Sequence, residues 1–107
     1  MRELFRRLGP RRSVSPPVGV VLWGKPDCSL CDKANAIVER LARDYPLTVD
    51  KRDITEDATA FERYRLVIPV VEIEGGPRFE GKVTEHRIRI ALEELRSGRE
   101  ALRRVDK

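Results

Sequence analysis

The hydrophobic positions of the chain change their period several times, and each change predicts a new element. Residues 18–23 form a continuous apolar run rich in β-branched side chains, which is typical of a strand buried on both faces. Gly24 and Pro26 then interrupt the run. From about Cys28 the apolar period becomes helical, and Pro46 ends this helix because proline disfavours helical geometry at the residue before it. The apolar face of the helix comprises Leu30, Cys31, Ala34, Ile37, Val38 and Leu41.

The middle of the chain alternates and then turns helical again. Residues 47–54 predict a second strand, with Leu47, Val49 and Ile54 directed inward. Thr55 is predicted to cap a short helix, whose first turn is acidic as the helix dipole favours. We expect Phe61 and Tyr64 to form the apolar side of that helix, because they lie three positions apart.

The last third of the chain predicts a hairpin followed by a helix. Residues 67–73 and 77–81 flank a Glu-Gly-Gly turn, which is a hairpin signal. A final helix is predicted to begin after Thr84 as its N-cap and to run to about residue 95. Val83 and Ile88 are spaced as a hydrophobic staple. The buried stripe of this helix comprises Ile88, Ala91, Leu92 and Leu95.

The element order is therefore β-α-β-α-β-β-α, which defines an α/β fold. A β-α-β unit is a parallel crossover, and a terminal hairpin adds antiparallel strands to the same sheet. We expect a thioredoxin-like three-layer fold, in which a four-stranded mixed sheet is covered by helices on both faces.

Charge separates the first residues from the rest of the chain. The chain carries a formal net charge of +4, and residues 1–17 supply all of it through five arginines opposed by Glu3. We therefore expect a basic N-terminal tail over residues 1–17 and one domain over residues 18–107. The tail either serves no purpose or forms a short amphipathic helix, from Arg2 to Leu8, on an acidic partner or on the domain. The balanced charge of the domain argues against a nucleic-acid groove.

The chain contains only two cysteines, three positions apart, and this count indicates the cellular compartment in which the protein works. Small secreted scaffolds usually carry more cysteines, spread to close long loops. No apolar stretch approaches the roughly 20 residues of a membrane span, and Arg6 and Arg7 interrupt any signal-peptide core. We expect the reducing cytoplasm, no membrane span and a monomer. An adjacent cysteine pair in that compartment indicates redox chemistry or metal binding.

The placement of the pair between a strand and a helix favours redox chemistry. Unpaired N–H groups at a helix N-terminus stabilise a thiolate at Cys28, which we expect to be the attacking nucleophile. Cys31 lies one turn further on the buried face, where it resolves the mixed disulfide. Lys25 favours the thiolate by its charge, whereas Asp27 and Asp32 oppose it.

Other interpretations of the pair remain open. In one interpretation, both cysteines are inert helix residues. In another, the protein is an interaction protein whose arginine tail binds an acidic partner, and the dithiol is vestigial. A zinc site needs about four ligands, and His86 on the last helix is the only histidine. We therefore assign no metal ligand within one chain. Two protomers that pool their cysteine pairs around a metal or an iron–sulfur cluster are the remaining metal-binding alternative.

Pro69 is the second unusual feature of the sequence. Proline is out of place inside a strand, so it marks either the first residue of the strand, in the ordinary trans form, or a special backbone geometry. A cis bond between Ile68 and Pro69 would present the Ile68 backbone to an incoming peptide or thiol.

These motifs together resemble a known family. Residues 25–31 (KPDCSLC) after a buried strand, 53–55 (DIT), 67–70 (VIPV) and 79–81 (FEG) before the last helix are similar to the glutaredoxin-like branch of the thioredoxin superfamily. The resemblance covers about residues 18–96. It implies a thiol–disulfide oxidoreductase that reduces or exchanges disulfides through Cys28 and Cys31, with Cys28 exposed, Cys31 buried and a cis Pro69 facing them. It also implies a substrate cleft formed by Lys25, Ile68, Pro69, Gly81 and Thr84.

The sequence departs from the glutathione-using relatives at two places. Ser29 and Leu30 replace the usual proline and tyrosine, and residues 81–84 (GKVT) replace the glycine, cysteine and aspartate pattern. Thr84 still offers its hydroxyl and the helix N–H groups that follow it to a carboxylate. We expect no bound cofactor. The substrate is a disulfide-containing protein or a low-molecular-weight thiol, and either glutathione or a thioredoxin-reductase-type partner donates the electrons.

Overall fold

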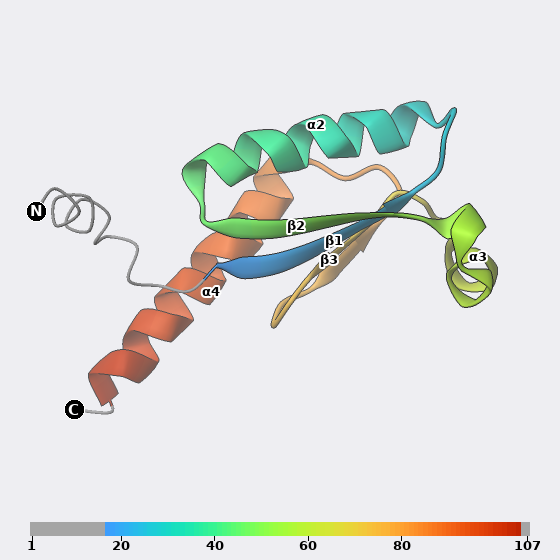
Figure 1. Cartoon of the computed structure of the whole chain (residues 1–107). Coiled ribbons are helices and arrows are strands. Elements are labelled where there is room, and N and C mark those ends of the chain that lie inside the picture. Colours follow the sequence, from blue (N-terminus) through green and yellow to red (C-terminus); the bar gives the residue numbers. More distant parts are fainter. Residues whose placement is uncertain (1–16, 106–107) are drawn as a thin grey trace, which may run out of the picture.

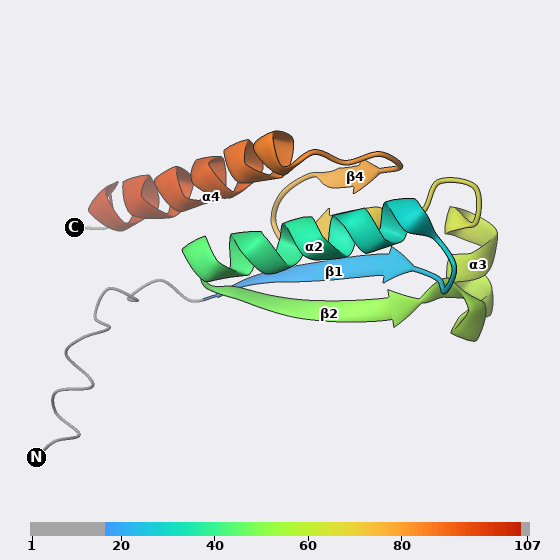
Figure 2. The ribbon, with the colours of Figure 1, turned by 90° about the horizontal axis from the view of Figure 1, so that it is seen from above.

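The computed structural model describes residues 17–105, and the side chains of residues 17–98. The prediction of a basic tail therefore lies outside the described residues, apart from Pro17. The elements follow the predicted order (Figures 1 and 2). They are β1 (Val18–Gly24), α2 (Ser29–Asp44), β2 (Leu47–Asp53), a 3-10 turn η2 (Ile54–Glu56), α3 (Ala58–Tyr64), β3 (Val70–Ile73), β4 (Arg78–Glu80) and α4 (Glu85–Val105).

The four strands form one mixed sheet in the order β2-β1-β3-β4. Strands β1 and β2 are parallel, with Val18 opposite Leu47, because α2 carries the chain back between them. Strand β3 is antiparallel to β1 and to β4, as a hairpin requires. The thioredoxin-like fold with a four-stranded mixed sheet is thereby confirmed.

Alternation along β1 builds a hydrophobic core on each face of the sheet. Val20 and Leu22 pack with α2 and α4 around Val38 and Ile88. Trp23 points to the other face, where it packs with Ile54, Ala60, Tyr64 and Val70 beside α3. Both views show α3 at the end of the sheet where β1 stops and α2 starts (Figures 1 and 2). The end of β1, the start of α2 and helix α3 therefore lie at the same end of the sheet.

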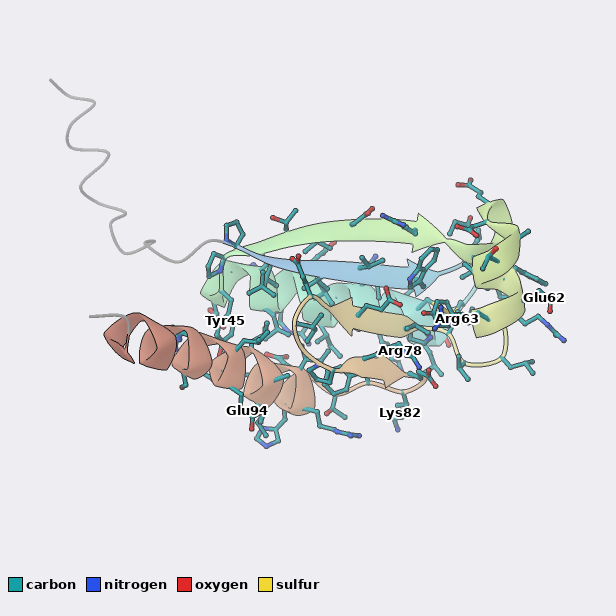
Figure 3. The ribbon with its side chains drawn as sticks, turned by 90° about the horizontal axis from the view of Figure 1, so that it is seen from below. Tyr45, Glu62, Arg63, Arg78, Lys82 and Glu94 are labelled. Atoms are coloured by element: carbon teal, nitrogen blue, oxygen red, sulfur yellow. A yellow bond between two sulfur atoms is a disulfide. The ribbon has the colours of Figure 1, made fainter. Side chains whose placement is uncertain are left out.

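Helix α2 has the boundaries that its sequence predicts. Cys28 is its N-cap, in an extended conformation, and the helix ends at Asp44, before Pro46. Its buried residues are Cys31, Ala34, Val38 and Leu41, all on the predicted apolar face. Leu30, also predicted on that face, is 38% exposed because it lies in the first turn, at the edge of the stripe. Tyr45 follows the helix, and Figure 3 shows it beside α4. Its hydroxyl donates a hydrogen bond of 2.6 Å to Glu93 of that helix.

The prediction for the short second helix is wrong in its start and in its buried face. Asp53, not Thr55, caps the first turn through its side chain, and Asp57 caps α3 itself. Moving the start of the helix rotates the face that meets the sheet. Ala60 and Tyr64 are buried, whereas Phe61 is 41% exposed.

The last elements differ from their prediction mainly in length. Strands β3 and β4 are shorter than expected, and Pro69 stands just before β3 instead of within it. Helix α4 continues ten residues beyond Leu95, to Val105. Its start is as predicted, because the hydroxyl of Thr84 accepts the N–H of Arg87 at 3.3 Å. Among residues 17–105, no helix combines the length and the hydrophobicity that crossing a bilayer requires.

Candidate functional site

The two cysteines lie at the N-terminus of α2 and form a disulfide, with their α-carbons 5.2 Å apart. The N–H of Cys31 points to the sulfur of Cys28 at 3.2 Å, so the sulfur takes the place of an N-capping oxygen. Cys28 is partly exposed, whereas Cys31 is 9% exposed. The geometry therefore separates a partly exposed cysteine at the helix end from a buried cysteine behind it.

Gly24 brings the end of β1 against the buried sulfur. A β-carbon placed on Gly24 would lie 3.2 Å from both the Cβ and the Sγ of Cys31. On the other side of β1, the antiparallel pairing with β3 ends at Trp23 and Val70. Gly24 directly follows one of these paired residues, and Pro69 directly precedes the other.

The bond between Ile68 and Pro69 is cis, as the family resemblance implies. Gly81 closes this turn from the side of β4. Its N–H lies 2.8 Å from the carbonyl oxygen of Val67 and 2.9 Å from that of Pro69. Gly81 has φ +76°, a conformation that favours glycine. The structure therefore joins three of the predicted site residues, Ile68, Pro69 and Gly81, in one turn.

The remaining predicted site residues are Lys25 and Thr84. Thr84 is exposed and serves as the cap of α4, so its hydroxyl already accepts one backbone N–H. Lys25 is exposed and lines a cavity on the β2 side of Cys31. Within the described part of the chain, no hydrogen bond or ion pair links Lys25 or Thr84 to the cysteines.

The cavity beside Cys31 has a volume of about 270 Å³. Cys31, Asp32 and Asn35 line it from α2, and Lys51 and Asp53 line it from β2. It approaches the buried sulfur from the side away from Pro69, since β2 and β3 flank β1 on opposite sides.

Two charged groups of the cavity lining, Lys51 and Asp53, are engaged with neighbours. The ammonium of Lys51 lies 2.8 Å from the carboxylate of Glu39, and this contact lowers the pKa of Glu39 below its ordinary value. The hydroxyl and the backbone N–H of Thr55 both donate to Asp53, which lowers the pKa of Asp53. Lys51 and Asp53 therefore each have a partner outside the cavity lining.

The fold and the family comparison now agree. The profile of the family described as Glutaredoxin-like domain (DUF836) matches residues 19–93, which include both cysteines, the cis proline and Thr84. The chain belongs to this glutaredoxin-like family. No curated protein sequence matches the chain closely enough to count as a relative.

Within the glutaredoxin-like domain, sequence reasoning missed the roles of Gly24 and Asn35 near the dithiol, and it considered Asp27 only for its charge. Gly24 was taken only as a turn residue, although it makes room for Cys31. Asp27, directly before Cys28, has φ 56°, which is uncommon for a residue with a side chain. Asn35 lines the cavity with Cys31, and its spacing of four residues from that cysteine was the available signal.

No metal site is found in the part of the chain that the structure describes. There, no group of three or more histidine, cysteine or carboxylate side chains is placed to hold an ion. His86 lies in the first turn of α4, far along the sequence from both cysteines.

Proposed function

We propose that this glutaredoxin-like protein is a thiol–disulfide oxidoreductase that works through Cys28 and Cys31. The observation that carries the proposal is the position of the Cys28 sulfur, 3.2 Å from the N–H of Cys31 at the start of α2. Negative charge is stabilised at this end of a helix, because the first N–H groups lack partners within the helix. This favours a thiolate at Cys28, and the thiolate is the nucleophile in disulfide exchange.

The reaction proceeds in two exchanges. The Cys28 thiolate attacks one sulfur of a substrate disulfide, forms a mixed disulfide and releases the other substrate sulfur as a thiolate. Cys31 then loses its proton, attacks the Cys28 sulfur and releases the second substrate thiol. The substrate gains two electrons, and the protein is left with the Cys28–Cys31 disulfide.

A thiol donor returns the protein to the dithiol form by the reverse chemistry. Glutathione and a thioredoxin-reductase-type protein are the two donors that we propose. In both cases the incoming sulfur reaches Cys28 from the side of the Ile68–Pro69 turn and Gly81, while Lys25 and Thr84 contribute a cation and helix N–H groups at the edges. We expect this chemistry in the reducing cytoplasm, where a dithiol persists.

Trapping of the mixed disulfide tests the assignment. Cys31→Ser leaves Cys28 free to attack and removes the resolving thiol, so it should accumulate a stable adduct with a small aromatic disulfide. Cys28→Ser should accumulate none. This variant is a fair control because serine is itself a favoured N-cap residue, so α2 keeps its start. Equal adduct formation by both variants would contradict the proposed division between nucleophile and resolving thiol.

The electron donor is tested separately. The wild-type protein is assayed for reduction of hydroxyethyl disulfide and of a protein disulfide, with glutathione and glutathione reductase in one arm and thioredoxin reductase in the other. Turnover in either arm supports an oxidoreductase and identifies its donor. Absence of turnover in both arms, with the protein folded and its disulfide reducible, would contradict the proposal.

A further inference from the structure

Asn35 carries a buried polar atom that has no partner. Within residues 17–98, two buried side-chain polar atoms lack a hydrogen bond, namely Asn35 Oδ1 and Trp23 Nε1. A buried acceptor without a donor is costly, so such an atom calls for an explanation. The oxygen itself is closed off from bulk solvent, although the rest of the side chain is partly exposed.

The candidate donor that we consider is the buried cysteine. Asn35 follows Cys31 by four residues on α2, so the two side chains lie on one face, one turn apart. Side chains in a helix lean toward its N-terminus, which directs the Asn35 carboxamide toward Cys31. Both residues also line the same cavity.

Two other donors do not serve this oxygen. Trp23 also lines the cavity, but its Nε1 has no hydrogen-bond partner itself, so it does not donate to Asn35. Lys51 lies on the same face as α2, but its ammonium is held by Glu39 at 2.8 Å. In the disulfide form, Cys31 itself has no hydrogen to give.

We propose that Asn35 is a positioning residue for the resolving thiol, and that its Oδ1 accepts a hydrogen bond from the S–H of Cys31 when the disulfide is reduced. Reduction adds two electrons and two protons to the Cys28–Cys31 bond, and one of these protons provides the donor that Asn35 lacks. The inference deepens the proposed function and rests on it only in that the dithiol and the disulfide must interconvert.

The consequence is an unlike environment for the two sulfurs. The Cys28 sulfur faces an N–H donor, which favours the thiolate. The Cys31 sulfur faces a carbonyl acceptor, which favours the protonated thiol. Asn35 thereby helps to direct the first ionisation to Cys28 and stabilises the dithiol relative to the disulfide.

The test is the equilibrium between the dithiol and the disulfide in mixtures of reduced and oxidised glutathione at pH 7. Free thiols are alkylated and counted by mass, for the wild type, Asn35→Leu and Asn35→Asp. The leucine has a similar size but no acceptor, so we expect a shift toward the disulfide of about tenfold, or ~30 mV. The aspartate keeps an acceptor oxygen, so its equilibrium should match the wild type or shift toward the dithiol.

Ala36→Leu is the matched control, because it places the same apolar residue at the next, exposed position of α2, outside the lining of the cavity. We expect its equilibrium constant to lie within about twofold of the wild type. Thermal unfolding of both redox forms checks that each variant folds, and Asn35→Leu should stabilise the disulfide form more than the dithiol form.

The inference is overturned if Asn35→Leu lies within twofold of the wild type, or if Asn35→Leu and Asn35→Asp shift together toward the disulfide. This measurement needs no catalytic turnover. If the reductase assays fail but the equilibrium shifts as expected, the result therefore counts against the proposed function alone. If the assays show turnover but the equilibrium does not shift, the result counts against the proposed role of Asn35 alone.

Discussion

Gly24 and Cys31 lie so close together that a side chain at position 24 would crowd the cysteine. A β-carbon at Gly24 would lie 3.2 Å from the Cβ and from the Sγ of Cys31, closer than such atoms ordinarily approach. The contact joins the last residue of β1 to the first turn of α2. It couples the position of the buried sulfur to β1. Because β1 pairs with β3, which begins directly after Pro69, the contact also links the sulfur to that part of the sheet.

Gly24→Ala should therefore destabilise the disulfide form more than the dithiol form. In the disulfide, the Cys31 sulfur is bonded and cannot rotate away, whereas a free thiol has other rotamers. Overpacking of this kind costs about 1–3 kcal/mol. Any gain from a stiffer unfolded chain is the same in both redox forms and cancels in their ratio. In glutathione mixtures, we expect the equilibrium to move toward the dithiol by about threefold or more, opposite to Asn35→Leu.

Gly98→Ala controls for the loss of a glycine as such. Nothing lies within 4 Å of a β-carbon at Gly98, which is inside α4. Alanine should stabilise both redox forms by about 1 kcal/mol and leave the equilibrium unchanged. An unchanged equilibrium in Gly24→Ala as well would show that the contact with Cys31 does not depend on the redox state.

Gly81→Ala should loosen the proline turn without any steric clash. A β-carbon there would meet nothing within 4 Å, so the cost comes only from φ +76°, at about 1–2 kcal/mol. The two hydrogen bonds from Gly81 to Val67 and Pro69 should weaken with it. We expect a lower midpoint of denaturant unfolding and a reduced rate of disulfide exchange. Gly81→Asn should lose less than alanine, because asparagine tolerates this conformation; equal losses would contradict the conformational explanation.

Asp27 combines an unfavourable conformation with an unfavourable charge. Its φ is 56°, and its carboxylate directly precedes Cys28. Asp27→Asn removes the charge and keeps the tolerance for this conformation, so the reduced protein should react faster with iodoacetamide at Cys28, by a few fold at pH 7. Asp27→Gly should give the same increase and add up to about 1 kcal/mol of stability. An asparagine variant that reacts no faster would show that this charge has no influence on the thiolate.

The order of the elements was predictable because each depends on a local pattern. The continuous apolar run of residues 18–23 predicts β1, and the helical spacing of apolar residues from Cys31 to Leu41 predicts α2. In both cases the pattern of buried positions is enough to identify the element. The short helix α3 was harder, because three candidate caps lie within five residues. Asp57, and not Thr55, caps α3, and this later start of the helix places Phe61 on its exposed side. A helix of seven residues contains too few apolar positions to fix its own phase.

The candidate site was predictable in its chemistry and less so in its packing. The cysteine spacing and Pro69 identified the dithiol turn and the turn beside it. The approach of Gly24 to Cys31 depends on how α2 lies on the sheet, which no local pattern encodes. The same is true of Asn35, since its spacing gives the face of the helix but not the absence of a donor.

The contact between Tyr45 and Glu93 predicts how stability depends on pH. The hydroxyl of Tyr45 and the guanidinium of Arg96 lower the pKa of Glu93 from its ordinary 4.5. A lowered carboxyl pKa stabilises the fold above 4.5, and this contribution is lost as the pH falls through the lowered value. Burial, and then the bond to Glu93, raise the pKa of Tyr45 above 10.0. Stability should therefore also fall as the pH rises past 10.0, because the unfolded chain ionises its tyrosine first.

Urea unfolding from pH 3 to 11 measures both effects. Glu93→Gln should lessen the loss of stability at acid pH, and Tyr45→Phe should lessen the losses at acid and at alkaline pH. Glu94→Gln changes the net charge equally beside the contact, and an acid curve that it flattens as much as Glu93→Gln does would refute the assignment.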